Sequence, residues 1–244
     1  MRINKYLSAC GLCSRREADR LLEAGRVSLN GKTAENGMQV GEEDVVCVDG
    51  KQVLLRKEKT YLKLYKHVGI VCTSDRREKD NVIDYIHYPV RVTYAGRLDR
   101  NSEGLLLLTD DGDLIEALMR SGNEHEKEYE VTVTRVLTPE ELEILRGGVW
   151  LEELCRKTRP CTVEHIGGTT YRFILTQGLN RQIRRMCRCL GVGIRKLKRV
   201  RVVSVKLDDM KPGELRPLTG EEQRSLAEQA AKNTTGQHRG FLLE

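Results

Sequence analysis

A run of four leucines, Leu105–Leu108, constrains the fold more than any other feature of this chain. The run follows Gly104 and ends in Thr109, so it is too short for an ordinary helix and presents no polar face. It predicts a short buried strand. Strand and helix patterns alternate around it from about residue 61 to residue 230. The sequence therefore predicts an α+β domain, in which helices flank a mixed, mostly antiparallel sheet.

The elements expected in this domain can be placed by their periodicity. Strand patterns occupy residues 61–66, 129–136, 169–178 and 194–207, and helical patterns occupy residues 111–120, 180–190 and 218–231. Thr138 and Pro139 are placed to cap and open a further helix. We expect a catalytic-sized domain over residues 59–232, preceded by a charged linker at 51–60. The end of the chain, residues 233–244, has no periodicity and is expected to be mobile.

The first 58 residues indicate a separate helix-plus-hairpin module. A capping box at Ser14 and Glu17 opens a helix after a first, shorter helix that begins near Ile3. Turns of the hairpin type follow at Asn30-Gly31 and Asp49-Gly50. Two helices followed by two hairpins resemble the alpha-L RNA-binding domain of small-subunit ribosomal proteins.

That resemblance implies which side chains of the module contact structured RNA. By position these are four basic residues: Lys5, Arg15, Arg16 and Arg20. The alternative is that Arg15 and Asp19 form only an exposed ion pair on the helix surface, worth a few tenths of a kcal/mol.

Positive charge is concentrated late in the chain. The net charge is +6, but between Glu164 and Asp208 there are eleven Lys and Arg residues and no acid. Such a block of like charges either binds a polyanion or destabilises the fold by repulsion. Because phosphate contacts supply most of the non-specific affinity for nucleic acids, the block favours a nucleic-acid partner. A solvated basic face is the alternative interpretation.

The eight cysteines favour neither disulfides nor a metal. Because the N-terminus lacks the apolar core of a signal peptide and no run reaches 18 apolar residues, we expect reduced thiols in a cytoplasmic protein. Cys10 and Cys13 have the spacing of half a zinc site, but Cys187 and Cys189 do not complete it.

The segment that carries most chemical information is AGRLDRNSEGLLLLTDDGDL, residues 95–114. Asp99 lies between Arg97 and Arg100 in a loop that leads into the leucine run, and Gly96 and Gly104 permit tight turns. A carboxylate among cations stays ionised and can act as a nucleophile or a base. The alternative is a surface ion pair without chemistry.

Three motifs in order resemble the RNA pseudouridine synthases of the ribosomal small-subunit/large-subunit subfamily. They are GRLDxxxxGLLLLTxDG around Asp99, the segment Lys127-Glu128-Tyr129, and GLNRQIRRM at residues 178–186. An alpha-L domain usually accompanies them. Details such as GNEHEKEY and GLNRQIRRMC are closest to the F-type members, which act on 23S ribosomal RNA.

The resemblance implies a role for each matching residue. Asp99 would be the essential carboxylate, Tyr129 would stack on the target uracil, and Arg184 would pair with the carboxylate. Arg97 would help to displace the uridine, and Leu175 would pack beside the third motif. Tyr129 as a core residue and Arg184 as a surface residue are the alternatives. Arg181, Arg184, Arg185 and Arg188 share one helix face that could follow an RNA backbone.

The reaction so implied isomerises uridine without redox chemistry, and we expect neither a cofactor nor a metal. No GxGxxG motif, Walker loop or zinc quartet occurs. The expected partner is 23S ribosomal RNA or a large-subunit assembly particle, bound by a monomer, with transfer RNA or small-subunit ribosomal RNA as other substrates. A non-catalytic ribosome-assembly factor and a DNA-binding regulator are the competing interpretations.

Overall fold

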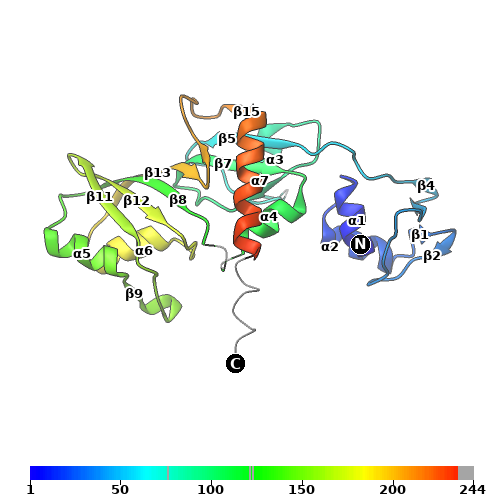
Figure 1. The fold of residues 1–244 in the computed structure, drawn as a ribbon, viewed down its shortest axis with the longest axis horizontal. Coiled ribbons are helices and arrows are strands. Elements are labelled where there is room, and N and C mark those ends of the chain that lie inside the picture. The colour runs from blue at the N-terminus through cyan, green and yellow to red at the C-terminus, as the bar shows by residue number, and fades with distance from the viewer. Residues whose placement is uncertain (76, 121, 123, 236–244) are drawn as a thin grey trace. The chain divides into compact units, whose positions relative to one another are not determined.

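The computed structural model describes residues 1–75, 77–120, 122 and 124–235, and the chain divides into two compact units (Figure 1). Unit 1 comprises residues 1–60 with two later segments, Tyr88–Thr93 and Thr109–Gly112. Unit 2 comprises residues 61–87, residues 94–108 and the chain from Asp113 onward. Each unit is described below by itself.

Unit 1 holds two helices and a four-stranded sheet. The elements are α1 (Ile3–Ala9), α2 (Arg15–Glu23), β1 (Val27–Leu29), β2 (Lys32–Thr33), β3 (Val46–Val48) and β4 (Lys51–Gln52), with strand order β2-β1-β3-β4. The capping box is confirmed, because Ser14 accepts from the Glu17 N–H and the Glu17 carboxylate accepts from the Ser14 N–H. Both hairpin turns are confirmed as well, with positive φ angles at Asn30 (52°) and Asp49 (50°).

The prediction of a linker at residues 51–60 was wrong for its first three residues. Lys51 and Gln52 form β4 against β3, and the Val53 N–H donates to the Val46 carbonyl at 2.9 Å. The apolar residues of the α1–α2 pair and the hairpins make one core, in which Ile3, Leu7 and Val46 are fully buried.

Unit 2 is built on a large mixed sheet. Its longest path runs β11-β12-β8-β13-β7-β5-β15, with β14 on β13 and β6 on β7. The strands are β5 (Tyr61–Lys66), β6 (Thr93–Ala95), β7 (Glu103–Thr109), β8 (Lys127–Val133), β11 (Thr162–Gly167), β12 (Thr170–Leu175), β13 (Ile194–Val202), β14 (Val205–Lys206) and β15 (Leu215–Pro217). The first residue of β6, Thr93, and the last residue of β7, Thr109, are assigned to unit 1. The pairing of β13 with β7 is parallel, and the pairings of β8, β11, β12, β14 and β15 are antiparallel. The mixed, mostly antiparallel sheet is therefore confirmed.

Helices flank this sheet, as expected. They are α3 (Val82–Ile86), α4 (Gly112–Met119), α5 (Pro139–Gly147), α6 (Gln182–Cys189) and α7 (Gly220–Thr235), and a small hairpin of β9 (Trp150–Leu151) and β10 (Arg156–Lys157) lies beside α6. Thr138 caps α5 and Pro139 is in its first turn, as predicted. Helix α7 continues to Thr235, three residues into the predicted tail, and residues 236–244 lie outside the described part of the chain.

One strand prediction needs correction. Residues 194–207 form a hairpin and not one strand, because Val203 takes a positive φ of 54° and β14 folds back onto β13. In the strand predicted at residues 61–66, which is confirmed as β5, Lys63 and Lys66 are both buried. Strand β5 lies inside the sheet, where Lys63 pairs with Asp208 and Glu222, and Lys66 donates to backbone carbonyls.

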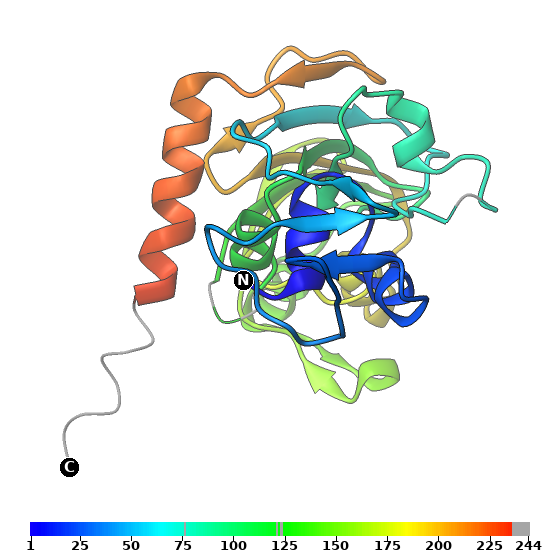
Figure 2. The ribbon, with the colours of Figure 1, turned by 90° about the vertical axis from the view of Figure 1, so that its right-hand side faces the viewer.

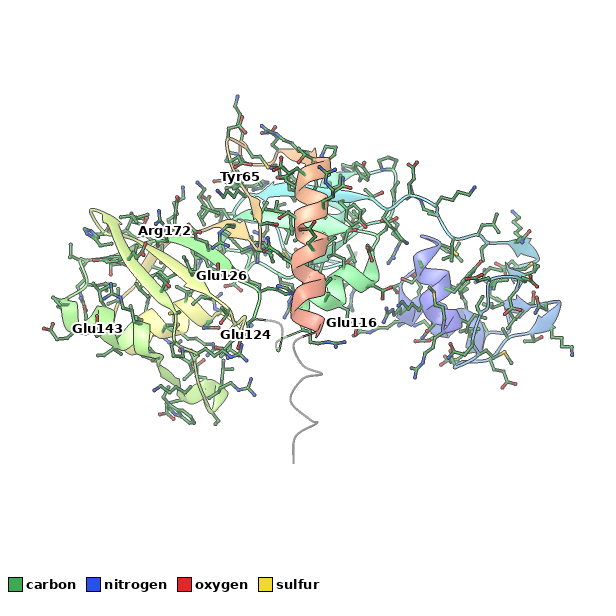
Figure 3. The ribbon with its side chains drawn as sticks, in the orientation of Figure 1. Tyr65, Glu116, Glu124, Glu126, Glu143 and Arg172 are labelled. Carbon is green, nitrogen blue, oxygen red and sulfur yellow. The ribbon has the colours of Figure 1, made fainter. Side chains whose placement is uncertain are left out.

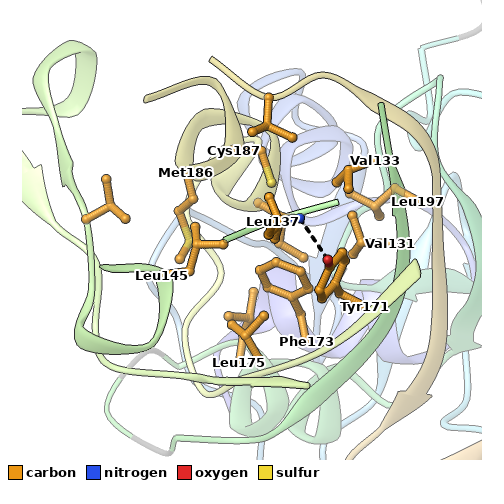
Figure 4. Close-up of a cluster of buried hydrophobic side chains, with 14 of the residues drawn as sticks. Val131, Val133, Leu137, Leu145, Tyr171, Phe173, Leu175, Met186, Cys187 and Leu197 are labelled. Atoms are coloured by element: carbon orange, nitrogen blue, oxygen red, sulfur yellow. Dashed lines mark hydrogen bonds between the residues drawn. The ribbon is translucent and has the colours of Figure 1, made fainter. Parts of the chain in front are cut away.

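Two apolar cores hold the helices on the sheet. In the first, residues of α5 and α6 pack with Val131, Phe173 and Leu197, and the Leu137 N–H donates to the buried Tyr171 hydroxyl at 2.8 Å (Figure 4). In the second, α4 and α7 pack on β5, β7 and β14. Leu105–Leu108 are at most 3% exposed, so the buried strand predicted from them is confirmed.

Charged side chains on the outer strands are paired across the ladder. Arg172 of β12, labelled in Figure 3, contacts Glu128 of β8 at 3.3 Å and Glu164 of β11 at 3.0 Å. Such pairs offset the charge of several bases of the basic block, among them Arg172, Lys198 and Arg201. In the part of the chain that the structure describes, no helix has the length and apolarity to cross a membrane.

Candidate active site

Asp99 lies in the loop between β6 and β7, and three contacts hold this loop in place. The Ser102 N–H donates to the Asp99 carbonyl at 3.0 Å, which closes a turn. The Leu98 N–H donates to the buried Cys72 thiol at 3.4 Å, and the Gly69 N–H donates to the Arg100 carbonyl at 2.9 Å. These contacts fix the backbone of the loop, and the Asp99 side chain that it carries is 29% exposed.

The guanidinium groups that face Asp99 come from a distant segment. One Asp99 carboxylate oxygen lies 3.5 Å from Arg184 Nε and 3.6 Å from Arg181 Nη1. Arg184 Nη2 also donates to the Asn101 carbonyl at 2.6 Å and to the Ser102 hydroxyl at 3.0 Å. Arg184 therefore binds the backbone of the Asp99 loop more tightly than the carboxylate itself, and the carboxylate keeps room for another contact.

The bases adjacent to Asp99 in sequence do not pair with it. Arg100 pairs with Asp80 at 2.8 Å, and Arg97 is exposed at the edge of the cleft. The expectation that Arg97 and Arg100 surround the carboxylate was therefore wrong. Neighbours in a tight loop point in different directions, whereas α6 brings Arg184 back to the loop from elsewhere in the fold.

A cleft of about 370 Å³ opens beside Asp99. Its lining includes Arg97, Lys127, Tyr129, Arg181 and Arg199. This volume falls in the range of pockets that hold a small ligand. Tyr129 stands on β8, paired with Phe173 of β12 and Arg199 of β13, and is partly buried. Its aromatic ring thus lines the same cleft as the carboxylate.

A smaller hollow adjoins this cleft, and Asp99 and Tyr129 line both of them. Leu175, at the end of β12, is 3% exposed and lines that hollow together with Asp99, Tyr129 and Arg184. The structure therefore brings together the five residues that the sequence singled out for this site: Arg97, Asp99, Tyr129, Leu175 and Arg184.

Buried cations beside the cleft were missed by the sequence reasoning. Arg199 is 2% exposed and its Nε donates to the Leu105 carbonyl at 2.7 Å, while its Nη2 has no hydrogen-bond partner among the described residues. Burial, reinforced by the charge of Arg199, lowers the pKa of Lys127 to about 8, and burial lowers the pKa of Lys66 to about 8. Lys127 lies in a recognised motif, but its burial was not foreseen. Arg199 was counted only as one base of the basic block.

The remaining predicted contact residues lie in two places. Arg185 and Arg188 of α6 both pair with Glu153 and extend the basic helix face away from Asp99. In unit 1, Arg15, Arg16 and Arg20 are exposed on α2, and Lys5 on α1 is partly buried. Asp19 accepts a hydrogen bond from Asn4 at 2.8 Å.

The donor set of the cleft suits a nucleotide. Guanidinium and ammonium groups can contact phosphate, an aromatic ring can stack on a base, and one carboxylate remains available for chemistry. Among the described residues, no group of three His, Cys, Asp or Glu side chains is arranged to hold a metal ion.

Comparison with known proteins agrees with this geometry. The family model for RNA pseudouridylate synthases matches residues 60–188, and the model for the S4 domain matches residues 1–46. The dual-specificity RNA pseudouridine synthase RluF of Escherichia coli is 45% identical over 91% of this chain and 77% of its own length. The ribosomal large subunit pseudouridine synthase B of Bacillus subtilis is 34% identical over 92% of this chain and 95% of its own. A crystal structure of a pseudouridylate synthase, 28% identical, superposes with a TM-score of 0.69 and covers 93% of this chain and 99% of that one.

Proposed function

We propose that this chain, which belongs to the RNA pseudouridylate synthase family, isomerises a uridine of 23S ribosomal RNA with Asp99 as its catalytic carboxylate. The observation that carries the assignment to Asp99 is its position: a carboxylate, 29% exposed, lines a cleft that also contains an aromatic ring and cations. The large-subunit substrate is supported by the name of the Bacillus subtilis relative.

The reaction exchanges one bond for another at the same ribose. The N-glycosidic bond from C1′ to N1 breaks, the uracil turns, and a bond forms from C1′ to C5. The proton on C5 leaves to solvent and N1 gains a proton, so atoms and electrons balance without an oxidant or a donated group. Asp99 touches the reacting nucleoside, as nucleophile at C1′ or the ring, or as base at the ribose.

The target uridine has to leave its helix to reach Asp99. Extruding a base costs a few kcal/mol, which stacking and hydrogen bonds in the pocket offset. Tyr129 supplies the stacking surface, and Arg97 stands at the exposed edge where the base would enter. Arg184 acts as a positioning residue because it holds the Asp99 loop through Asn101 and Ser102.

The cations provide the long-range attraction. Arg181, Arg185 and Arg188 on or beside α6 and Lys5, Arg15, Arg16 and Arg20 of unit 1 would contact RNA phosphates. We assign RNA binding to an alpha-L module of residues 1–58 and catalysis to residues 59–232. An enzyme on ribosomal RNA or its assembly particle works in the cytoplasm, and nothing in the proposed chemistry needs more than a monomer.

Release of tritium from RNA labelled at the uracil C5 position tests the reaction directly. The full chain should release tritium from large-subunit ribosomal RNA, and Asp99→Asn should reduce release on the order of 10⁴-fold while RNA binding persists. Asp80→Asn is the matched control, since Asp80 is an exposed carboxylate paired with Arg100. Full release by Asp99→Asn would refute the assignment.

Transfer RNA is a second candidate substrate, because the Escherichia coli relative is named as having dual specificity. The same assay with transfer RNA and with small-subunit ribosomal RNA separates the substrate classes. A map of pseudouridines in cellular RNA, with and without this protein, identifies the position. If large-subunit RNA is unchanged in that map, the 23S assignment fails.

A further inference from the structure

The chain has a single tryptophan, Trp150, and its side chain is exposed. Trp150 stands on β9, in a hairpin that projects from the rest of unit 2 (Figures 1 and 2). It is 51% exposed, whereas the next residue, Leu151, is 2% exposed and belongs to the apolar core. Since side chains alternate along a strand, the burial of Leu151 turns the indole toward solvent.

A lysine lies beside this indole across the hairpin. The β9–β10 register places Lys157 directly opposite Trp150, so both side chains lie on one face of the hairpin. Arg156 and Lys157 are both exposed. The turn of the hairpin carries Glu152 and Glu153, but Glu153 is paired with Arg185 and Arg188 of α6. The hairpin by itself carries two acids and two bases, so the surplus of positive charge beside the indole comes from Arg185 and Arg188 of α6.

Helix α6 connects this face to the candidate active site. Arg181 and Arg184 contact Asp99 at the start of the helix, and at its end the Cys189 thiol lies 3.8 Å from the Trp150 carbonyl. Eight residues of helix span about 12 Å. That distance corresponds to roughly three or four nucleotides at a stacked spacing of about 3.4 Å.

We infer that Trp150 stacks on an unpaired base of the RNA substrate, a few nucleotides from the target uridine, with Lys157 and Arg188 on the adjoining phosphates. The inference rests on the proposed function, since RNA has to be the molecule that enters the cleft. The connection to that cleft through α6 and the nearby bases favour RNA over a protein partner. An aromatic platform of this kind accepts any base, so it strengthens binding without selecting a sequence.

Because Trp150 is the single tryptophan, indole fluorescence reports on this position alone. Titrating the full chain with a large-subunit ribosomal RNA fragment should quench the emission and protect it from acrylamide. Trp150→Ala should raise the RNA dissociation constant and KM about 5- to 100-fold, with kcat at saturating RNA unchanged. Trp150→Phe should lose less RNA affinity than Trp150→Ala, because the smaller phenyl ring can still stack on a base.

Ile144→Ala is the matched control, since Ile144 is 48% exposed on α5. It should leave RNA binding unchanged. Tight RNA binding by Trp150→Ala, or bound RNA without acrylamide protection, overturns the inference. Emission that changes with protein concentration and not with RNA means that a second copy covers the indole, which also overturns it. If the protein releases tritium from RNA but its tryptophan emission does not respond to RNA, only this inference is refuted. If the emission responds to RNA but no tritium is released, only the proposed reaction is refuted.

Discussion

Arg184 has the most constrained guanidinium among those facing Asp99. It is 17% exposed, whereas Arg181 is 46% exposed, although both lie near the same carboxylate oxygen. Burial and the like charge of Arg181 lower the pKa of Arg184. The guanidinium nevertheless holds three groups at once, because its Nη2 donates to Asn101 and Ser102 while its Nε forms an ion pair with Asp99. An ammonium group cannot do so from one position.

Arg184→Lys should therefore lower kcat about 100-fold while KM changes less than about threefold, since the charge remains but the Asp99 loop loses its position. Single-turnover tritium release measures the chemical step, and thermal unfolding of the same sample checks the fold. Arg120→Lys alters an exposed pair with Glu116 on α4 and should leave kcat unchanged. A normal kcat with a raised KM would make Arg184 an RNA-binding residue only.

The parallel pairing of β7 with β13 sets the geometry beneath the site. Lys198 and Arg199 of β13 are in register with Glu103 and Gly104 of β7. Gly104 has a φ of 106°, and a Cβ there would lie 2.2 Å from the Arg199 carbonyl oxygen. The glycine is thus required both for its backbone conformation and for close approach of the two strands. The strand pair in turn holds Arg199 beside the cleft.

Gly104→Ala should lower the free energy of unfolding by about 3 kcal/mol or more, because it combines a backbone clash with a strained φ angle. Chemical denaturation measures the loss. Gly147→Ala is the control: among the described residues, no heavy atom beyond its chain neighbours and its own helix backbone lies within 4 Å of a Cβ there, and its φ is ordinary, so the change should stay within about 0.5 kcal/mol. Equal stability of the two variants would contradict the close packing of β7 against β13.

At the scale of the whole chain, basic residues occur on both units. Unit 1 exposes Arg15, Arg16 and Arg20 on α2, and unit 2 exposes Arg181 and Arg188 at the two ends of α6. Two linked binding modules raise the affinity for a ligand that both can reach. The chemistry needs only the cleft of unit 2, so the bases of unit 1 should govern binding and not the chemical step.

Replacing Arg15, Arg16 and Arg20 together by Ala should raise KM for ribosomal RNA about 10- to 100-fold and leave kcat unchanged at saturating RNA. The slope of log affinity against log salt concentration should become less negative by about 2 to 3, since each lost phosphate contact contributes about 0.7 to 0.9 to that slope. The matched triple variant replaces Arg26, Lys32 and Lys51, which are exposed on the same unit. Equal weakening by both triples would show that net charge matters and the α2 face does not.

The sequence by itself determined the local structure and the family. The caps at Ser14 and Thr138, the turns at Asn30 and Asp49, and the burial of Leu105–Leu108 depend on neighbours along the chain, so their patterns predicted them. The family resemblance predicted that Arg184 pairs with Asp99, and the two groups lie 3.5 Å apart, but only the tertiary structure placed Arg181 at the same carboxylate and paired the adjacent Arg100 with Asp80. It also buried Lys66 and Arg199, whose backbone carbonyl partners become available only after β5, β7 and β13 assemble. Contacts between segments about 80 to 100 residues apart depend on sheet order and register, which periodicity in one segment does not contain.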